Sequence, residues 1–251
     1  MSHDDVQFGE EMIRLASADN FRDVADADAG LRRGVVYRSN ELQLLDEDAA
    51  TLADLGIAAI YDLRDDYEVE AHPDIEIPGA TWTHAEIKGI PPGTGAELPD
   101  AEAARAAIIG VYRRFVTDPD ARTSFATVLR AVATSSAPML FHCTAGKDRT
   151  GWAAALMLHV AGVERGVVET DYLETNNRSA GTREKYLGLV AEHLGPDRVA
   201  TFEPTMVADL SYLDAAYTTA DAEYGSLDGY LRDGLGLDDD ILAALRSRLR
   251  A

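Results

Sequence analysis

One stretch, residues 138–160, restricts the fold of this chain more than any other. A short apolar run ends at His142 and is followed by a loop of small and charged residues. The segment from Trp152 to Val160 after that loop is almost wholly apolar. This order predicts a buried strand, a tight loop and a buried helix. Backbone N–H groups converge where a loop enters a helix, and the helix dipole favours an anion there.

The loop carries a cysteine and an arginine whose spacing has a chemical use. Cys143, the only cysteine in the chain, opens the loop, and Arg149 follows with five residues between them. Backbone amides, a helix amino end and a guanidinium all stabilise a thiolate, which is the nucleophilic form of cysteine. The same groups can bind a phosphate dianion beside the sulfur, because a planar guanidinium holds two oxygens at once. We therefore expect Cys143 to be a nucleophile and Arg149 to hold the phosphate.

The residues beside and between this pair receive supporting roles. Thr150 can offer its hydroxyl to the thiolate or to the departing thiol. His142 can brace the loop through its ring nitrogens, and it orients the loop without acting as a base because the thiolate is already formed. The phosphate oxygens are expected to contact the intervening residues, Thr144, Ala145, Gly146 and Lys147. The Lys147 side chain can bind a further acidic group of the substrate, or it can be a solvated charge at the rim.

The string His142-Cys-Thr-Ala-Gly-Lys-Asp-Arg-Thr-Gly151 resembles the Cys-x5-Arg signature of the protein tyrosine phosphatase superfamily. With Lys-Asp before the arginine, it is similar to the bacterial tyrosine/lipid phosphatase subfamily that includes the secreted mycobacterial phosphatase B. The strings at 20–23, 38–39 and 62–64 also match that subfamily. The resemblance implies a cysteine-dependent tyrosine or dual-specificity phosphatase. It would act on phosphotyrosine, phosphoserine or phosphothreonine and phosphoinositides through a cysteinyl-phosphate, without metal or cofactor.

Three alternatives to a phosphatase loop fit these residues less well. A nucleotide-binding P-loop requires glycine at 141 and a hydroxyl at 148, where the chain has Phe141 and Asp148. An inert buried thiol is common for a lone cysteine, but it leaves the accompanying glycine, arginine and threonine without a purpose. A catalytically silent module that binds phosphorylated ligands is the alternative of another class, and the intact cysteine–arginine pair argues against it.

The group that protonates the leaving oxygen is less clearly marked. Many relatives use an aspartate in a Trp-Pro-Asp loop, but the two tryptophans here are followed by Thr83 and Ala153. Asp148 is the first candidate for the acid, although it can also pair with a neighbouring lysine or cap the helix. Asp62 is the second candidate. Asp62 and Arg64 follow a buried strand, so they either reach the site at the sheet edge or form a surface ion pair.

The rest of the chain predicts an α/β fold with one phosphatase domain. Strand patterns at 34–39, 57–64 and 81–87 alternate with helical patterns, which favours a central, mostly parallel sheet of four to five strands flanked by helices. The C-terminal half is expected to be helical, and Asp46 and Asp118 are expected to cap the helices that follow them. We expect an N-terminal extension over residues 1–19 and a single domain over 20–251. The loop at 88–100 and the partly helical 177–205 are candidate lids, although an apolar stripe in the latter is more typical of a core.

Charge and hydropathy limit the partners. The formal net charge of −21 argues against nucleic acid as a partner and against nonspecific binding to anionic membranes, and it weighs mildly against the alternative substrate class of inositol polyphosphates. The resemblance implies a phosphorylated protein or phospholipid as the partner. No apolar run approaches the length of a membrane span, and the first residues resemble no signal peptide. We expect a cytoplasmic protein, with signal-less secretion and the oligomeric state left open.

Overall fold

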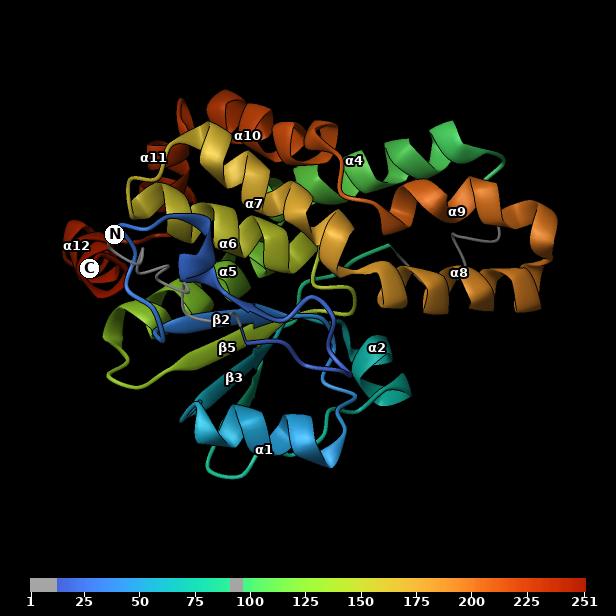
Figure 1. Cartoon of the computed structure of the whole chain (residues 1–251). Coiled ribbons are helices and arrows are strands. Elements are labelled where there is room, and N and C mark those ends of the chain that lie inside the picture. The colour runs from blue at the N-terminus through green and yellow to red at the C-terminus, as the bar shows by residue number, and fades with distance from the viewer. Residues whose placement is uncertain (1–12, 91–96) are drawn as a thin grey trace, which may run out of the picture.

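A five-stranded sheet forms the centre of the computed structural model, which describes residues 13–90 and 97–251 (Figure 1). The strand order is β1-β2-β5-β3-β4, with β1 antiparallel to β2 and the other neighbours parallel. The strands are β1 (Arg22–Asp23), β2 (Val36–Ser39), β3 (Ala59–Asp62), β4 (Thr81–His84) and β5 (Met139–His142). The predicted α/β class with a mostly parallel sheet is confirmed.

The register of the sheet brings three polar strand ends to one level. In the central strand β5, His142 is paired with Ser39 of β2 on one side and with Asp62 of β3 on the other. These three residues are the last of their strands. In parallel sheets ligands bind beyond the carboxyl ends of the strands, so the loop that follows His142 lies where a site is expected.

Helices cover both faces of the sheet, and most of them follow the central strand in the sequence. The helices are α1 (Asp46–Asp54), α2 (Asp66–Ala71), α4 (Ala101–Thr117), α5 (Pro119–Thr134), α6 (Asp148–Val160), α7 (Arg165–Arg178), α8 (Ala180–Leu194), α9 (Val199–Met206), α10 (Leu210–Tyr224), α11 (Leu227–Gly229) and α12 (Asp239–Leu249). Shorter helical turns are η1 (Val24–Ala27), η2 (Pro196–Arg198) and η3 (Tyr230–Gly234). The expected helical C-terminal half is confirmed.

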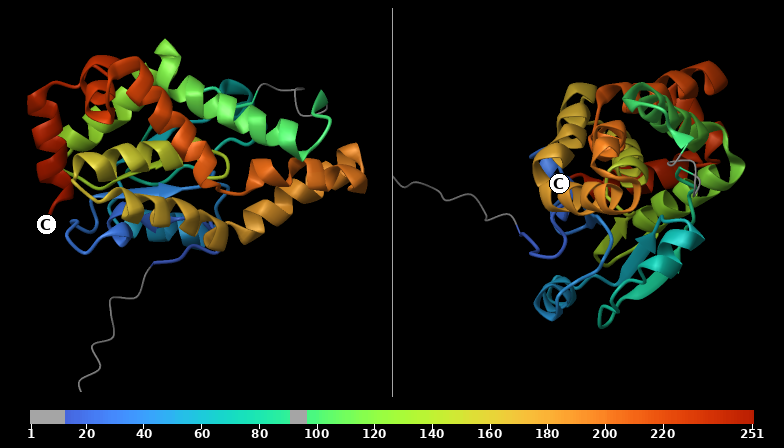
Figure 2. Two further views of the ribbon diagram at one scale, coloured as in Figure 1. Left: turned by 90° about the horizontal axis from the view of Figure 1, so that it is seen from above. Right: turned by 90° about the vertical axis from the view of Figure 1, so that its right-hand side faces the viewer.

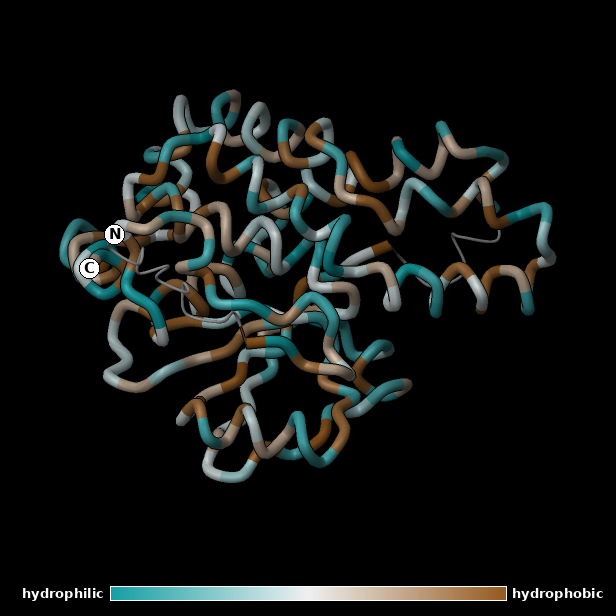
Figure 3. Tube along the Cα trace, in the orientation of Figure 1, coloured by the Kyte–Doolittle hydropathy of each residue, from teal (hydrophilic) through white to brown (hydrophobic). Residues whose placement is uncertain are grey.

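The two faces of the sheet belong to two apolar cores. Leu140 of β5 packs in a smaller core with residues of α1, whereas Met139 and Phe141 pack in the larger core with α4, α5, α6 and α10. This alternation follows from the period of two in a strand, and the continuous apolar run of β5 follows from burial on both faces. Figure 3 shows apolar residues along the central strands.

Helix beginnings agree with the sequence in one case and differ in another. Asp118 caps α5 as expected, because its side chain accepts a hydrogen bond of 2.9 Å from the backbone N–H of Asp120. The expected cap at Asp46 is wrong: Leu45 is the N-cap of α1, and Asp46 is the first helical residue. An acidic residue in a first turn still favours the helix dipole. At α6 the side chain of the N-cap residue, Lys147, accepts no hydrogen bond from the backbone amides of the first turn, which keeps those amides available for a ligand.

Helices α8 and α9 project from one side of the molecule beside α4, against which α9 packs, as two views show (Figures 1 and 2). The expectation that the apolar stripe of 177–205 packs into the core is wrong, because Thr182 is the only buried residue of α8. Of the stripe, Tyr186 is half-buried and Leu189 is exposed. Part of the other candidate lid, residues 91–96, lies outside the described residues. Within the described chain, no helix is both long and apolar enough to cross a membrane.

Candidate active site

The loop from Cys143 to Lys147 begins at the end of β5 and enters α6 directly. Gly146 has a φ of 65°, a backbone conformation that residues with a Cβ rarely adopt. A Cβ on Gly146 would also lie 2.6 Å from the backbone carbonyl oxygen of Ser39 and 2.7 Å from the side-chain nitrogen (Nδ2) of Asn20. Both the turn and the close packing therefore require glycine at this position.

Three residues hold the carbonyl groups of this loop from behind. The Asn20 side chain donates to the carbonyls of Ala145 and Gly146 over 3.2 and 3.0 Å, and Arg38 donates to Gly146 over 3.1 Å. The backbone N–H of Glu41 donates to the carbonyl of Thr144. Across a trans peptide, the N–H of the next residue points away from the carbonyl. The amides that follow these carbonyls therefore point away from the three supports, as a phosphate cradle requires.

A buried charge cluster lies behind the same loop. Asp171 of α7 pairs with Arg22 over 3.0 Å and with Arg38 over 2.7 Å. Burial lowers the pKa of Arg38 to about 10, and the positive charge of Arg22 adds to this effect. Because one carboxylate balances two guanidinium groups, an excess of positive charge remains behind the loop. In the sequence, residues 20–23 stood out only as a string that matches the subfamily, and there was no signal for Asp171.

Arg149 is held by a carboxylate that sequence reasoning missed. Its Nη1 and Nη2 atoms donate to Glu68 of α2 over 2.5 and 2.8 Å, and Nη1 also donates to the carbonyl of Ile87. Burial opposes the charge of Arg149, but the carboxylate of Glu68 overcomes it and raises the pKa of Arg149. In the same way, burial opposes the charge of Glu68, and Arg149 overcomes it and lowers the pKa of Glu68 to about 2. The hydroxyl of Thr144 donates to Glu68 as well.

A capping box is the sequence signal that could have found Glu68. Asp65 is the N-cap of α2 and accepts from the backbone of Glu68, whose carboxylate accepts from the backbone of Asp65 in return. A helix that begins just after a strand carboxyl end places its first turn at the sheet edge.

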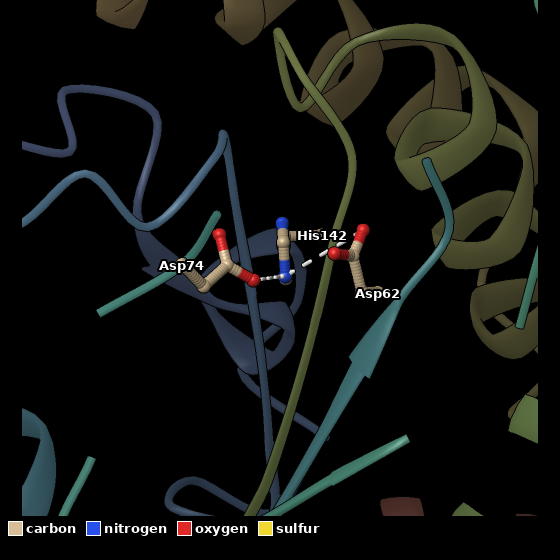
Figure 4. Close-up of side chains that lie close together, drawn as sticks. All are labelled: Asp62, Asp74 and His142. Carbon is tan, nitrogen blue, oxygen red and sulfur yellow. Dashed lines mark ion pairs between the residues drawn. The ribbon is translucent and has the colours of Figure 1, made fainter. Parts of the chain in front are cut away.

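Asp62 lies with Asp74 and His142 in a separate ion cluster (Figure 4), and Arg64 joins it by pairing with both carboxylates. Arg64 donates to Asp62 over 2.7 Å and lies 2.8 Å from Asp74, while the His142 ring pairs with Asp74 over 2.9 Å. Burial opposes the charge of Asp62, but His142 and Arg64 overcome it and lower its pKa to about 2. Burial likewise opposes protonation of His142, and Asp74 overcomes it and raises its pKa.

This cluster braces the strand ends and does not open onto the pocket. Asp62, Arg64 and His142 are fully buried, and none of them lines the pocket described below. The sequence left Asp62 and Arg64 either at the site or in a surface ion pair; in the structure they are bonded to each other and buried. Ligand atoms of Asp62, Asp74 and His142 lie within 4.8 Å of one another, a spacing that a metal ion could use. The guanidinium of Arg64 already pairs with both carboxylates, and the His142 ring pairs with Asp74, so these residues fit an ion-pair network better than a metal site.

Lys147 has neither of the two expected environments. Its side chain is 1% exposed, its ammonium group donates to Asp148 over 2.8 Å, and it lies 5.2 Å from the centre of the Tyr212 ring. It is therefore neither a solvated rim charge nor part of the pocket lining. Asp148, the first residue of α6, is 22% exposed and lines the pocket.

The pocket has a volume of about 340 Å³ and joins the loop to residues of α2, α4, α8 and α9. Its polar residues include Glu68, Cys143, Thr144, Asp148 and Arg149. Its apolar walls are formed by Ile90, Leu98, Ile108, Val111, Phe115, Phe202 and Met206, with the ring of Tyr186 from α8. The structure thus brings Cys143, Asp148 and Arg149 together around one space. The hydroxyl of Thr150 is buried and makes no hydrogen bond with any described residue.

Comparison with known proteins agrees with the geometry of this pocket. The profile of the tyrosine phosphatase family matches residues 13–251. The chain is 34% identical to the triple specificity protein phosphatase PtpB of Mycobacterium tuberculosis over 256 positions, covering 87% of this chain and 92% of the relative. A protein named as a tyrosine-protein phosphatase in Nostoc commune is 26% identical over 223 positions, covering 82% of this chain and 71% of the relative. The resemblance inferred from the loop is confirmed.

Proposed function

The chain belongs to the tyrosine phosphatase family, and on this premise we propose that it hydrolyses phosphotyrosine in proteins through a phosphocysteine. Phosphoserine, phosphothreonine and phosphoinositides are proposed as further substrates, in line with the triple specificity named for the mycobacterial relative. The observation that carries the proposal is that Cys143, Asp148 and Arg149 line the same pocket. A thiol, a carboxyl group and a guanidinium around one space are the three groups that this chemistry needs.

In the first step the thiolate of Cys143 attacks phosphorus. The S–P bond forms as the P–O bond to the substrate breaks, and Asp148 gives its proton to the departing oxygen. Arg149 and the loop amides stabilise the charge on the three remaining oxygens. In the second step water attacks phosphorus, Asp148 accepts a proton from that water, and the sulfur leaves as thiolate. Inorganic phosphate is the product, and the enzyme returns to its starting state.

Asp148 is the acid in this proposal, and Asp62 is not. Asp148 lines the pocket on the first turn of α6, beside the residues that hold the phosphate. Asp62 is fully buried and bonded to Arg64, and its lowered pKa keeps it ionised at neutral pH. A carboxylate without a proton cannot serve as an acid. We therefore assign Asp62, Arg64 and His142 to bracing the sheet edge below the loop.

The pocket walls favour an aromatic leaving group over a polyphosphate. Apolar side chains from several helices surround the entrance, and they suit the ring of a phosphotyrosine. Three carboxylates line the same pocket, at Asp65, Glu68 and Asp148, against one arginine. An inositol polyphosphate would bring several further negative charges to a site with this balance. That alternative therefore ranks below phosphotyrosine.

The domain, a helical lid and the cellular compartment complete the proposed function. Residues 20–251 act as one phosphatase domain, and α8 with α9 covers the pocket as a lid, since Tyr186 and Phe202 line it. We place the reaction in the cytoplasm, because a reducing compartment keeps a reactive thiol from oxidation.

Phosphate release from a panel of substrates tests the proposal. The panel contains a phosphotyrosyl peptide, a phosphoseryl peptide, a phosphoinositide and an inositol polyphosphate. We expect the highest kcat/KM with the phosphotyrosyl peptide and no detectable turnover of any substrate by the Cys143→Ser variant, which should still bind them. Absence of turnover by the wild-type enzyme would favour the silent binding module. A preference for the inositol polyphosphate would favour the alternative enzyme.

A further inference from the structure

Two arginines lie buried side by side behind the loop at 143–147. Arg22 of β1 and Arg38 of β2 are paired directly across the two antiparallel strands, and each is only 1% exposed. Like charges at paired positions repel each other, and a buried charge without a partner is strongly destabilising. Asp171 of α7 pairs with both, over 3.0 Å to Arg22 and 2.7 Å to Arg38. The fold thus holds two like charges together at this place with one carboxylate.

Both arginines connect to the carbonyl groups of the loop. Nη2 of Arg38 donates to the carbonyl of Gly146 over 3.1 Å. Nη1 of Arg22 donates to the side-chain oxygen of Asn20. The side-chain nitrogen of Asn20 donates in turn to the carbonyls of Ala145 and Gly146, over 3.2 and 3.0 Å. The carboxylate between the two arginines therefore supports the loop along two routes, one through a single arginine and one through an arginine and the asparagine.

The carbonyl of Gly146 is the point where both routes meet. It accepts one hydrogen bond from Asn20 and one from Arg38, which uses both lone pairs of the oxygen. Gly146 has a positive φ, and glycine changes backbone conformation more easily than other residues. Without these two donors, the peptide unit would be free to turn its carbonyl oxygen, in place of the N–H of Lys147, toward a bound phosphate. The two donors oppose that turn.

We propose that Asp171, Arg22 and Arg38 are positioning residues for phosphate binding: they fix the Gly146 peptide so that the loop amides face the phosphate. This inference rests on the proposed function, because it assumes that the loop binds phosphate. None of the three positioning residues lines the active-site pocket, so they act through the loop and do not touch the substrate. Helix α7 thus contributes to phosphate binding although none of its residues lines that pocket.

Charge alone makes the opposite prediction for Asp171. Its carboxylate is a negative group behind a site for an anion, so its removal should strengthen phosphate binding if only the electrostatic potential matters. Positioning predicts weaker binding, because the two arginines lose the group that holds them together. A merely structural role predicts a lower Tm with unchanged affinity in the folded protein. The sign of the change in affinity therefore separates the three accounts.

The test measures the Kd of inorganic phosphate by calorimetry in the Cys143→Ser protein, which binds phosphate without turnover. Asp171→Asn is added to that protein, and Asp48→Asn is the matched control. Asp48 is a buried carboxylate of α1 that accepts hydrogen bonds from the backbone N–H groups of residues 16 and 17. Its loss should lower the Tm without changing the support of the loop.

Arg38→Lys is the second test variant, and it keeps the charge behind the loop. Two nitrogens of the Arg38 guanidinium bond to Asp171 and Gly146 at once, whereas an ammonium group is a point charge without that planar fork. We expect the Kd of phosphate to rise about tenfold in Asp171→Asn and about fivefold in Arg38→Lys, the scale of losing a hydrogen bond that involves a charged group. In Asp48→Asn it should change less than about twofold.

Tighter or unchanged phosphate binding in Asp171→Asn would overturn the inference, as would an equal weakening in Asp48→Asn. If Asp171→Asn does not fold, Arg38→Lys decides the matter, and an unchanged Kd in that variant would overturn the inference. Failure of the inference alone leaves turnover by the wild-type enzyme and phosphate binding by Cys143→Ser intact. Failure of the proposed function shows as no turnover by the wild-type enzyme, and if Cys143→Ser alone binds no phosphate, both fall together.

Discussion

Helices α6 and α8 both contribute to the pocket, but the chain supports them in opposite ways. Of the 13 residues of α6, 11 are buried, whereas Thr182 is the only buried residue among the 15 of α8. Helix α6 is fixed between the sheet and the other helices. Helix α8 is attached through polar contacts: Lys185 and Tyr186 bond to Glu41 over 2.6 and 2.9 Å, and Thr182 bonds to Asp19.

The difference matches what each wall has to do. The groups that hold phosphate lie at the first turn of α6, where displacement by about 1 Å can cost on the order of a hundredfold in rate. The wall from α8 and α9 contacts the rest of the substrate, where proteins and lipids differ in shape. Elements with few buried contacts open at low free-energy cost. We therefore expect changes on the α6 side to alter the rate of chemistry, and changes on the α8 side to alter the motion of the wall.

The largest effect is expected for Arg149→Lys on the fixed side. An ammonium group cannot hold two phosphate oxygens in the plane of a guanidinium. We expect kcat/KM for 4-nitrophenyl phosphate to fall about a thousandfold, the scale of losing a main transition-state donor. The exposed Arg232 pairs with Asp239 at the surface, so Arg232→Lys is the control and should be unchanged. A loss of less than about tenfold in Arg149→Lys would show that α6 does not set the chemistry.

Glu68→Gln should have the second-largest effect. The amide keeps the size of the side chain but removes the charge that holds Arg149, so we expect kcat/KM to fall about thirtyfold. Glu70→Gln is the matched control, because Glu70 is an exposed residue of the same helix. A rise in activity would contradict this interpretation, since it would mean that the carboxylate competes with phosphate for Arg149.

The pH dependence of stability tests the same ion pair. The pKa of Glu68 is lowered to about 2, below the value of about 4.3 in an unfolded chain. Its stabilising contribution is therefore present above about pH 4.3 and is lost as the pH falls toward 2, on the order of 2 kcal/mol in all. Urea unfolding at pH 6 and pH 3 should show a wild-type advantage over Glu68→Gln that shrinks at the lower pH. An equal difference at both pH values would exclude the ion pair as its cause.

The smallest effect on activity is expected on the α8 side. Glu41→Gln weakens the bonds to Lys185 and Tyr186, so hydrogen exchange in residues 180–194 should accelerate about tenfold while exchange in α6 stays unchanged. Turnover of 4-nitrophenyl phosphate should change less than about threefold, because the chemistry lies on the other wall. Glu169→Gln, at an exposed pair with Arg165 on α7, is the control. Equal acceleration in both helices would break the distinction between the two walls.

The parts of the site that the sequence predicted are local ones. The strand, loop and helix of 138–160 were predictable because apolar runs of the right length flank a loop with glycine at one turn. The mostly parallel sheet followed from the alternation of strand and helix patterns. In each case the physical cause lies within a few neighbouring residues.

The environments that the sequence did not predict depend on distant partners. The burial of Lys147 depends on Tyr212 of α10, which lies far from Lys147 in the sequence. The inward orientation of Asp62 and Arg64 depends on Asp74 and His142, which complete their cluster. Residue spacing alone cannot name such partners. The same holds for the apolar stripe of α8, whose spacing predicts a helix with an apolar face but not what covers that face.

Capture of the covalent intermediate tests the central claim most directly. The Asp148→Asn variant should form the phosphocysteine from 4-nitrophenyl phosphate and lose it slowly, because the water of the second step lacks its base. After rapid acid quenching and proteolysis, mass spectrometry should find one phosphoryl group on the peptide that contains Cys143, and none in the Cys143→Ser, Asp148→Asn double variant. A phosphoryl group on another residue, or rapid turnover with no covalent species at all, would contradict the account.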